Sequence, residues 1–271
     1  MIVCFSGTGN TRSAALQLAA RLGDSHVVFP DAAMLRDPGS AVLMPGEQDS
    51  CIVWAFPVYG WGMPPVVERL IRLAKLEGRG ALLPHYMLAT CGDDIGRTDR
   101  HWRRAMADRG WKAAGAFVVR MPNTFVFMPG FNVDSEAVAT RKLSDAPAVI
   151  ARIADMIGGK IPVEDIVIPG AMPGLKSGLL RSFFWDVYMK TRRFRSTDAC
   201  IGCGTCARSC PMENITIEDG RPQWGDACAY CLRCYHVCPW HAIDYLHTTA
   251  GKGRYLNPEG CKQPQRKINN K

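Results

Sequence analysis

The chain has 271 residues, of which 47% are hydrophobic and 21% are charged, and its formal net charge is +8. This composition excludes a disordered or fibrous chain, and the length allows about two globular domains. Because the sequence shows neither a secretory signal peptide nor a run of 18 apolar residues, we expect a soluble cytoplasmic protein without membrane association.

The first predicted elements are a short strand at residues 1–5, a glycine-rich turn and a helix that ends near Gly23. Such a turn directs free backbone N–H groups toward an anion, so it predicts a phosphate site. A Walker A loop would end in Gly-Lys-Ser/Thr, and a dinucleotide fingerprint would have a third glycine where Arg12 stands. Asp31 leaves NAD open by its spacing alone. The polar side chains of the turn suit a terminal phosphate monoester better; the turn consists of Ser6, Gly7, Thr8, Gly9, Asn10 and Thr11.

Strands and helices alternate as far as residue 158. Strands are predicted at 49–56, near 86–90 and at 114–119, and helices after Pro65, over 98–109 and from Pro147 onward. This alternation predicts an α/β domain with a doubly wound, five-stranded parallel sheet, which binds ligands beyond the carboxyl ends of its strands. Two loops follow strands at that edge: Pro57, Val58, Tyr59, Gly60, Trp61 and Gly62, and Thr90, Cys91, Gly92 and Asp93.

Two apolar segments come next. The loop 121–133 carries Phe125, Phe127 and Phe131, and we expect it to pack under its own domain rather than to form a lid or a pad against a second domain. Residues 159–198 predict a linker that ends in an amphipathic helix. We expect this helix to be a buried interdomain strut rather than a membrane-surface helix; its apolar face would comprise Leu179, Leu180, Phe183, Phe184, Val187 and Tyr188.

Eight of the twelve cysteines form two copies of one spacing, each followed by a proline. Runs of the form C-x2-C-x2-C-x3-C-P hold [4Fe–4S] clusters, and the fourth cysteine of each run ligates the other cluster. We therefore assign Cys200, Cys203, Cys206 and Cys238 to one cluster, and Cys210, Cys228, Cys231 and Cys234 to the second. Zinc sites and disulfide frameworks are disfavoured, because neither requires this doubled run. Short strands are expected at Ile215–Ile217 and Ile243–Tyr245.

These motifs resemble known families. Residues 199–246 are similar to a bacterial-type two-cluster ferredoxin, a small α+β domain, and the segment Ser6–Thr11 resembles the phosphate loop of flavodoxins. In flavodoxins, the loops that correspond to 57–62 and 90–93 hold the flavin ring. The resemblance thus implies FMN, with Tyr59 and Trp61 as candidate stacking residues. Over nearly its whole length the chain resembles the flavodoxin–ferredoxin fusions called EFR-family ferrodoxins, which implies electron transfer in anaerobic metabolism.

The resulting prediction has four parts: a flavodoxin-like FMN domain at 1–158, a linker at 159–198, a ferredoxin domain at 199–246 and a basic tail at 247–271. We expect the tail to be a solvated extension or a docking handle; its Cys261 has no assigned role. The leading hypothesis is a carrier that passes electrons between FMN, two [4Fe–4S] clusters and a redox partner protein, without catalytic residues of its own.

The alternative is an FMN-dependent reductase that acts on a small molecule with electrons from its own ferredoxin domain. His85, Cys91 and Asp93 are possible parts of such a site. Nucleic-acid binding is not expected, because the basic residues of the linker and the tail form no motif that reads DNA or RNA.

Overall fold

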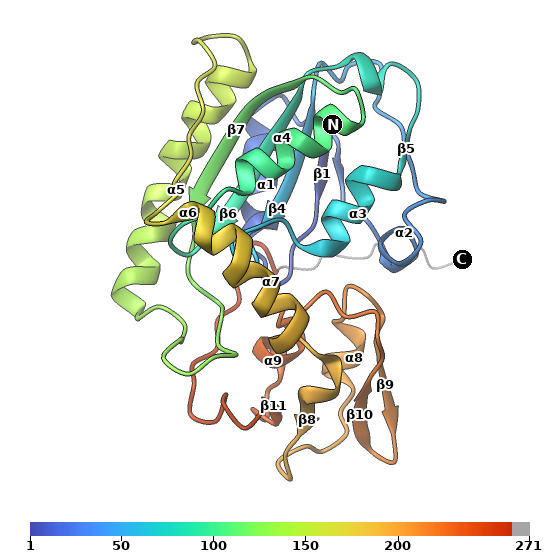
Figure 1. Cartoon of the computed structure of the whole chain (residues 1–271), viewed down its shortest axis with the longest axis vertical. Helices are drawn as coiled ribbons and strands as arrows, with labels where there is room; N and C mark the ends of the chain where they lie inside the picture. Colours follow the sequence, from blue (N-terminus) through green and yellow to red (C-terminus); the bar gives the residue numbers. More distant parts are fainter. Residues whose placement is uncertain (262–271) are drawn as a thin grey trace, which may run out of the picture.

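The computed structural model describes residues 1–261 and shows a parallel five-stranded sheet in the first half of the chain (Figure 1). The strands are β1 (Ile2–Cys4), β2 (Val27–Val28), β4 (Ile52–Pro57), β6 (His85–Cys91) and β7 (Ala113–Arg120), in the spatial order β2-β1-β4-β6-β7. Counted within the sheet, this order is 2-1-3-4-5, which is the flavodoxin-like doubly wound order. The predicted fold class of this half is therefore confirmed.

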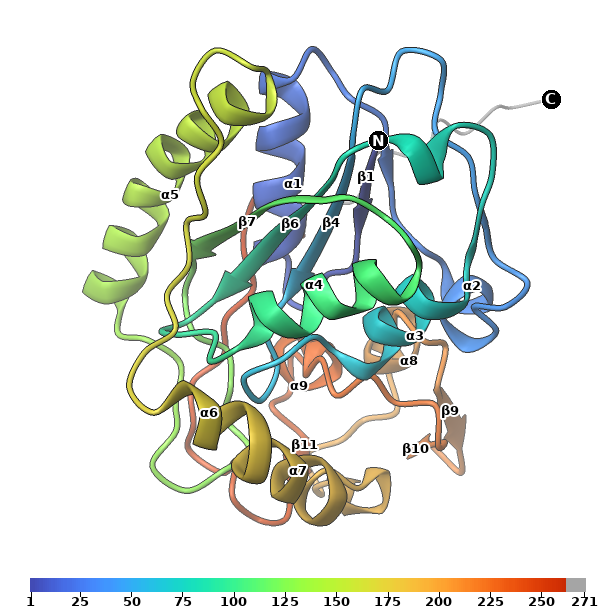
Figure 2. The same cartoon turned by 45° about the horizontal axis from the view of Figure 1, so that its top comes forward.

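Helices cover both faces of the sheet (Figure 2). On one face, α1 (Asn10–Arg21) and α5 (Glu136–Ile157) share a core with the alternate strand residues Ile2, Val53 and Leu88. On the other face, α3 (Pro65–Leu73) and α4 (Thr98–Asp108) pack on a second core that contains Trp54 and Met87. The central strands β4 and β6 are largely apolar because both of their faces are buried. Short elements complete this half: α2 (Ala32–Arg36), a 3₁₀ turn (Gly80–Leu82), and β3 (Val42–Leu43) paired with β5 (Lys75–Leu76).

Helix α5 corrects one prediction. Its first turn begins at Glu136 rather than at Pro147, which lies in the helix interior. Proline there lacks an N–H and loses one intrahelical hydrogen bond, at a cost of about 3 kcal/mol. The helix continues because the apolar stripe of Leu143, Ala146 and Ile150 packs on the core on both sides of the proline. After α5, the chain returns along β7, where Ile166 bridges to Phe117.

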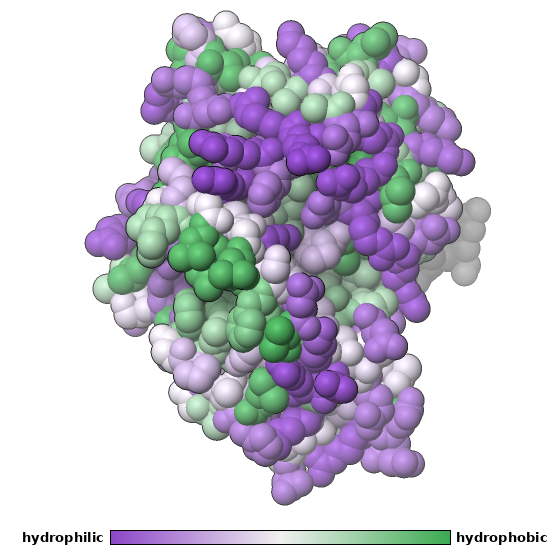
Figure 3. All heavy atoms as spheres, viewed as in Figure 1, coloured by the Kyte–Doolittle hydropathy of each residue, from purple (hydrophilic) through white to green (hydrophobic). Residues whose placement is uncertain are grey.

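The linker helix differs from the predicted strut. It combines α6 (Pro173–Leu175) and α7 (Arg181–Phe183) with π-helical stretches at Lys176–Leu180 and Phe184–Tyr188. The wider π turns rotate the side chains away from the alignment that a regular helix would give. Phe184 is buried, but the predicted inner residues Leu179, Phe183 and Val187 are 71%, 55% and 47% exposed. Figure 3 shows apolar side chains along this strip of the surface.

The second half of the chain is small and built around two cysteine loops. Strand β8 (Phe194–Ser196) pairs with β11 (Ile243–Tyr245), and β9 (Ile215–Glu218) forms a hairpin with β10 (Arg221–Trp224). The two predicted strands are thus present, but each has a partner that the sequence reading did not name. Helices α8 (Thr205–Arg208) and α9 (Arg233–Val237) lie against each other, and a 3₁₀ turn (Thr191–Arg193) precedes β8. No helix in residues 1–261 is both long and apolar enough to cross a membrane.

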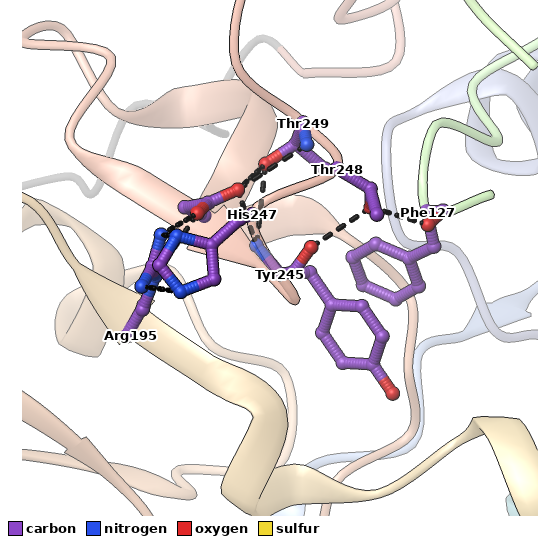
Figure 4. Close-up of polar contacts among 7 residues, drawn as sticks. Phe127, Arg195, Tyr245, His247, Thr248 and Thr249 are labelled. Carbon is purple, nitrogen blue, oxygen red and sulfur yellow. Dashed lines mark hydrogen bonds and ion pairs between the residues drawn. The ribbon is translucent and has the colours of Figure 1, made fainter. Parts of the chain in front are cut away.

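The aromatic loop 121–133 packs against this second half, which corrects the expectation that it lies under its own domain. The ring of Phe127 stacks on Tyr245 at a centroid distance of 4.0 Å, and its carbonyl accepts hydrogen bonds from Tyr188 and Thr248. Figure 4 shows Thr248 beside Phe127, in the corner after β11. The Asp244 carboxylate in this corner accepts hydrogen bonds from Thr249 and from Arg195. Burial raises the pKa of Asp244, but these hydrogen bonds outweigh it and hold the pKa below its usual value.

The chain then crosses back to the first half, so residues 247–261, which we call the strap, are not a solvated extension. The Asn257 N–H donates to the Thr8 carbonyl at 2.9 Å, and the Asn257 side chain donates to Asn10 Oδ1 at 3.2 Å. Cys261 donates to the same Thr8 carbonyl. The remaining predicted tail residues, among them Lys262, Arg266 and Lys267, lie outside the described residues.

Candidate functional site

The phosphate loop, Ser6–Thr11, connects β1 to α1 at the carboxyl edge of the sheet. Two of its side chains form hydrogen bonds with neighbouring segments: Thr11 Oγ1 lies 2.7 Å from Thr90 Oγ1, and Asn10 Nδ2 donates to the Pro122 carbonyl at 2.9 Å. The hydroxyl of Ser6 is buried without a hydrogen-bond partner in residues 1–261. An unpaired buried hydroxyl is costly, so this atom indicates a polar ligand.

A cavity opens beside this loop, and we call it the main cavity because most of the predicted binding residues line it. They are Ser6, Gly7, Thr8, Asn10, Thr11, Pro57, Val58, Tyr59, Gly60, Thr90, Cys91 and Gly92. Trp61 and Asp93 line an adjoining cavity that shares Val58, Gly60, Cys91 and Gly92 with the first. Gly9 and Gly62 line neither. The side of Gly9 that a Cβ would occupy faces Cys261, and that of Gly62 faces the Arg181 guanidinium.

Arg181, which the sequence reading missed, holds the loop 57–62. Its guanidinium donates to the carbonyls of Tyr59 at 2.7 Å, Gly60 at 3.1 Å and Met63 at 2.6 Å. Burial lowers the pKa of Arg181. The neighbouring Ser177 hydroxyl binds the carbonyl of Trp61, a residue with φ of 55°. The linker helix therefore fixes the backbone of this loop.

Further cavity residues come from segments whose role the sequence did not specify. Trp185 of the linker helix lines the main cavity, and its buried indole N–H has no partner in the described chain. The others are Met121, Pro122, Asn123, Thr124, Phe125, Phe184, Met189, Tyr230, Cys231 and Leu232. The phenylalanine loop and the linker helix were visible as apolar segments, but only the fold places both at one cavity.

The cysteines form two groups, each containing the last cysteine of the other run. Cys200, Cys203, Cys206 and Cys238 line one small cavity, the outer group. In the inner group, burial raises the pKa values of Cys228, Cys231 and Cys234, and the neighbouring Cys210 raises them further. Among residues 1–261, no three His, Cys, Asp or Glu side chains converge on a single ion. The thiolates of a cubane bind separate iron atoms and lie farther apart.

The inner cysteines touch the phosphate loop. A Cβ on Gly7 would lie 2.8 Å from each of Cys231 Cβ, the Cys231 carbonyl oxygen and the Tyr59 hydroxyl. Arg233, two residues further on, donates to the Gly7 carbonyl at 2.8 Å. Burial raises the pKa of Cys231 to about 11, and Arg233 acts in the opposite direction. The main cavity and the inner cysteines therefore share Cys231 as a common wall.

The outer cysteines lie toward solvent. Cys203 is exposed, and hydrogen bonds from Thr205 lower its pKa. Ile201 and Trp240, which line the same small cavity, are 60% and 53% exposed. The two groups thus differ in access: one adjoins the main cavity and the other adjoins the surface.

A flavodoxin-like sheet with a loop-lined cavity at its binding edge, joined to two groups of four cysteines, defines a redox protein of the flavin and iron–sulfur class. Residues 199–243 match the family described as "4Fe-4S dicluster domain", so this part of the chain is an iron–sulfur domain.

Similarity to individual proteins is limited. A stretch of 24 residues is 67% identical to the coenzyme F420 hydrogenase subunit gamma of Methanosarcina barkeri, and the match spans only 9% of either chain. A flavodoxin of Streptococcus pneumonia TIGR4 is 17% identical over 59% of this chain and 97% of its own, with a TM-score of 0.36. A flavone reductase is 12% identical over 89% of this chain and 84% of its own, also with a TM-score of 0.36. The flavodoxin-like fold is assigned from the strand order of the sheet.

Proposed function

We propose that the chain is an electron carrier that binds one FMN and two [4Fe–4S] clusters and exchanges electrons with a redox partner protein. Bound FMN takes up electrons in pairs and exchanges them singly, and each cluster exchanges one electron. The partner and the direction of flow are left open. The residues of the main cavity support FMN, and the two cysteine groups support the clusters.

The phosphate loop fits a phosphate monoester. The unpaired hydroxyl of Ser6 and the backbone N–H groups at the start of α1 supply donors. The absence of a side chain at Gly7 keeps the loop in contact with Cys231. The flavin ring would lie between the loops 57–62 and 90–93, where Tyr59 and Trp61 offer aromatic faces and Trp185 offers an unpaired N–H.

The cluster proposal follows the two cysteine groups. Cys210, Cys228, Cys231 and Cys234 would hold an inner cluster, and Cys200, Cys203, Cys206 and Cys238 an outer cluster. The Trp224 indole N–H, which is buried, lies by Cys234 and would stabilise its thiolate. Cys203 of the outer group is exposed, so we propose that the exchange with the partner protein occurs there.

One observation carries the proposal: Cys231 belongs both to the wall of the main cavity and to the inner cysteines. Electrons that leave the cavity would meet the inner cluster first and the outer cluster second. The Tyr59 hydroxyl lies next to Gly7 on the same side as Cys231, so this aromatic residue of the cavity is also close to the inner cysteines.

A second function, a reductase of small molecules, is favoured by the adjoining cavity. It contains Trp61, Asp93 and an ion pair in which Lys176 Nζ lies 2.5 Å from Asp94 Oδ2. A lysine and a carboxylate beside a flavin could bind a polar substrate. Of the three pieces named from the sequence, Cys91 and Asp93 line this cavity, whereas His85 does not. His85 is fully buried and stacks against Trp54 and Trp111.

The test is anaerobic purification followed by quantification of iron, sulfide and FMN. About eight iron atoms and one FMN per chain are expected, and an iron content near four or a chain without FMN would refute the proposal. Cys203→Ala should then remove the outer cluster and leave flavin-to-cluster transfer intact, whereas Cys231→Ala should abolish that transfer. Saturable turnover of small oxidants that Lys176→Met abolishes would favour the reductase instead.

A further inference from the structure

A cavity larger than the main cavity lies between the two halves of the chain. It has a volume of about 530 Å³ and shares only Ser6 with the main cavity. Gly9 and Arg12 of the first half form one wall, and α8 and α9 of the second half form another. Small-molecule sites typically occupy about 300–1,000 Å³ and often lie at domain interfaces. The proposed electron route does not use this space.

Three arginines, Arg12, Arg208 and Arg233, line the cavity, and we call it the arginine cavity. Within residues 1–261, none of them has a carboxylate at salt-bridge distance, in contrast to Arg103 and Arg195, which pair with aspartates at 2.7 Å and 2.5 Å. A guanidinium has five N–H donors. The contacts of the three use few of these donors, so the cavity presents unused donors and positive charge.

Those contacts orient the guanidinium groups. The Arg12 guanidinium lies 4.2 Å from the centre of the Phe29 ring, and Arg233 donates to the Gly7 carbonyl. Arg208 lies 3.5 Å from the Thr205 hydroxyl. The carboxylate of Asp31 accepts from the Met34 N–H at 2.9 Å at the start of α2, and within residues 1–261 it forms no ion pair with these arginines.

Compensation of cysteine charge explains only part of this arrangement. Arg233 lowers the pKa of Cys231, and Arg208 contributes to the lowered pKa of Cys203. The charge of Arg12 acts on Cys4, which belongs to neither group, and opposes the effect of burial, which raises the pKa of Cys4 to about 12. The three arginines come from three separate helices and do not all lie near one cysteine group; what they have in common is the cavity.

We propose that the arginine cavity binds a phosphorylated organic molecule, such as a nucleotide. Guanidinium groups bind phosphate oxygens in bidentate fashion. Phe29, Pro30 and Leu256 provide an apolar wall for the organic part. Arg208 is exposed and Phe29 is 36% exposed, so the ligand reaches the site without separation of the two halves.

The position of the arginine cavity beside the inner cysteines implies that a bound ligand would change their redox properties. Cys210 lines the arginine cavity, so a bound dianion would oppose the addition of an electron at the inner cysteines. We expect the ligand to lower the midpoint potential of the inner cluster. This effect rests on the proposed cluster at Cys210, whereas the binding itself does not, so a binding assay and a redox titration can fail separately.

The binding test is calorimetry on the anaerobic holoprotein with inorganic phosphate, pyrophosphate, ADP and NADP⁺ at constant ionic strength. We expect 1:1 binding of ADP or NADP⁺ that is tighter than that of inorganic phosphate. Arg12→Gln and Arg208→Gln should each weaken it about tenfold or more. Arg192→Gln, which removes an exposed arginine outside the cavity, is the matched control and should leave it unchanged. Iron and FMN contents establish that each variant is folded.

Four results would overturn the proposal. One is no binding of any phosphate compound by the holoprotein, and another is inorganic phosphate that binds as tightly as ADP. The third is binding that the control variant Arg192→Gln weakens as much as Arg12→Gln and Arg208→Gln do, which would indicate general attraction to a basic surface. If the two cavity variants impair only the binding of an acidic peptide such as polyglutamate, the cavity belongs to a protein-docking surface and the small-molecule site is wrong.

Discussion

Gly7→Ala tests the contact between the phosphate loop and the inner cysteines. The new Cβ would lie 2.8 Å from Cys231 Cβ, the Cys231 carbonyl oxygen and the Tyr59 hydroxyl, about 0.6 Å closer than ordinary contacts. Gly7 does not have a positive φ, so alanine brings no backbone strain of its own. The penalty falls on the contact between the two halves, and overpacking of this size costs about 1–3 kcal/mol.

That free energy lowers the ratio of docked to undocked protein about 5- to 160-fold. We expect the melting temperature to fall by a few degrees, since 1 kcal/mol corresponds to about 2–4 °C for a chain of this size. Electron transfer from photoreduced FMN to the clusters should slow at least in proportion to any loss of the docked form. Stopped-flow and flash-photolysis absorbance, which separate flavin from cluster signals, measure both species.

The control is Gly178→Ala, because a Cβ at that exposed position meets no atom within 4 Å. FMN content should stay near one per chain in both variants, since the loop keeps its backbone N–H groups. Wild-type transfer rate and melting temperature in Gly7→Ala would refute the close contact. Loss of FMN with normal cluster content would instead place the damage in the phosphate loop.

Three further predictions concern Arg181, Asn257 and His236. Arg181→Met removes the donor to three loop carbonyls and should weaken FMN binding tenfold or more in a fluorescence titration, whereas Arg192→Met should not. Asn257→Ala removes the side-chain bond to Asn10 and should lower the melting temperature by about 2–4 °C, with unchanged stability contradicting a structural strap. Burial lowers the pKa of His236 to about 4, so on acidification the unfolded chain binds a proton at a higher pH than the folded chain. The free energy of unfolding is therefore unaffected by this group above about pH 6.5 and decreases toward pH 4 by up to about 3 kcal/mol. Melting temperatures at pH 7 and 5 should therefore differ less in His236→Gln than in wild type; equal differences would refute the assignment.

The sequence predicted the sheet because its strands are strongly apolar and separated by glycine- and proline-marked turns. β4 and β6 are buried on both faces, so a largely apolar run identified each. The prediction failed at Pro147, where a local rule about proline was overruled by packing on both sides of it. It failed again in the linker helix, since π-helical turns cannot be read from a pattern that assumes 3.6 residues per turn.

The site was predictable where a motif is local. The phosphate loop and both cysteine runs are contiguous in sequence, and the structure brings the cysteines into two groups that exchange their fourth members. Arg181, Trp185 and the strap were missed because their roles depend on contacts between residues far apart in the chain. Asn257, for example, meets Asn10 across 247 residues, and no spacing rule relates the two.

The two cysteine loops also differ in a way that bears on function. The backbone is left-handed at equivalent points of both, at Gly202 and Gly204 in the first copy and at Tyr230 and Leu232 in the second. Glycine adopts this conformation freely, whereas a larger residue there costs about 1–3 kcal/mol. Tyr230 and Leu232 line the main cavity, while the first loop lies near the surface. The second copy therefore carries strain at two positions where the first has glycine, and in return its side chains close the cavity against Cys231. The two loops are thus unequal where one of them faces the flavodoxin-like domain, and this difference is consistent with the proposed inner and outer clusters.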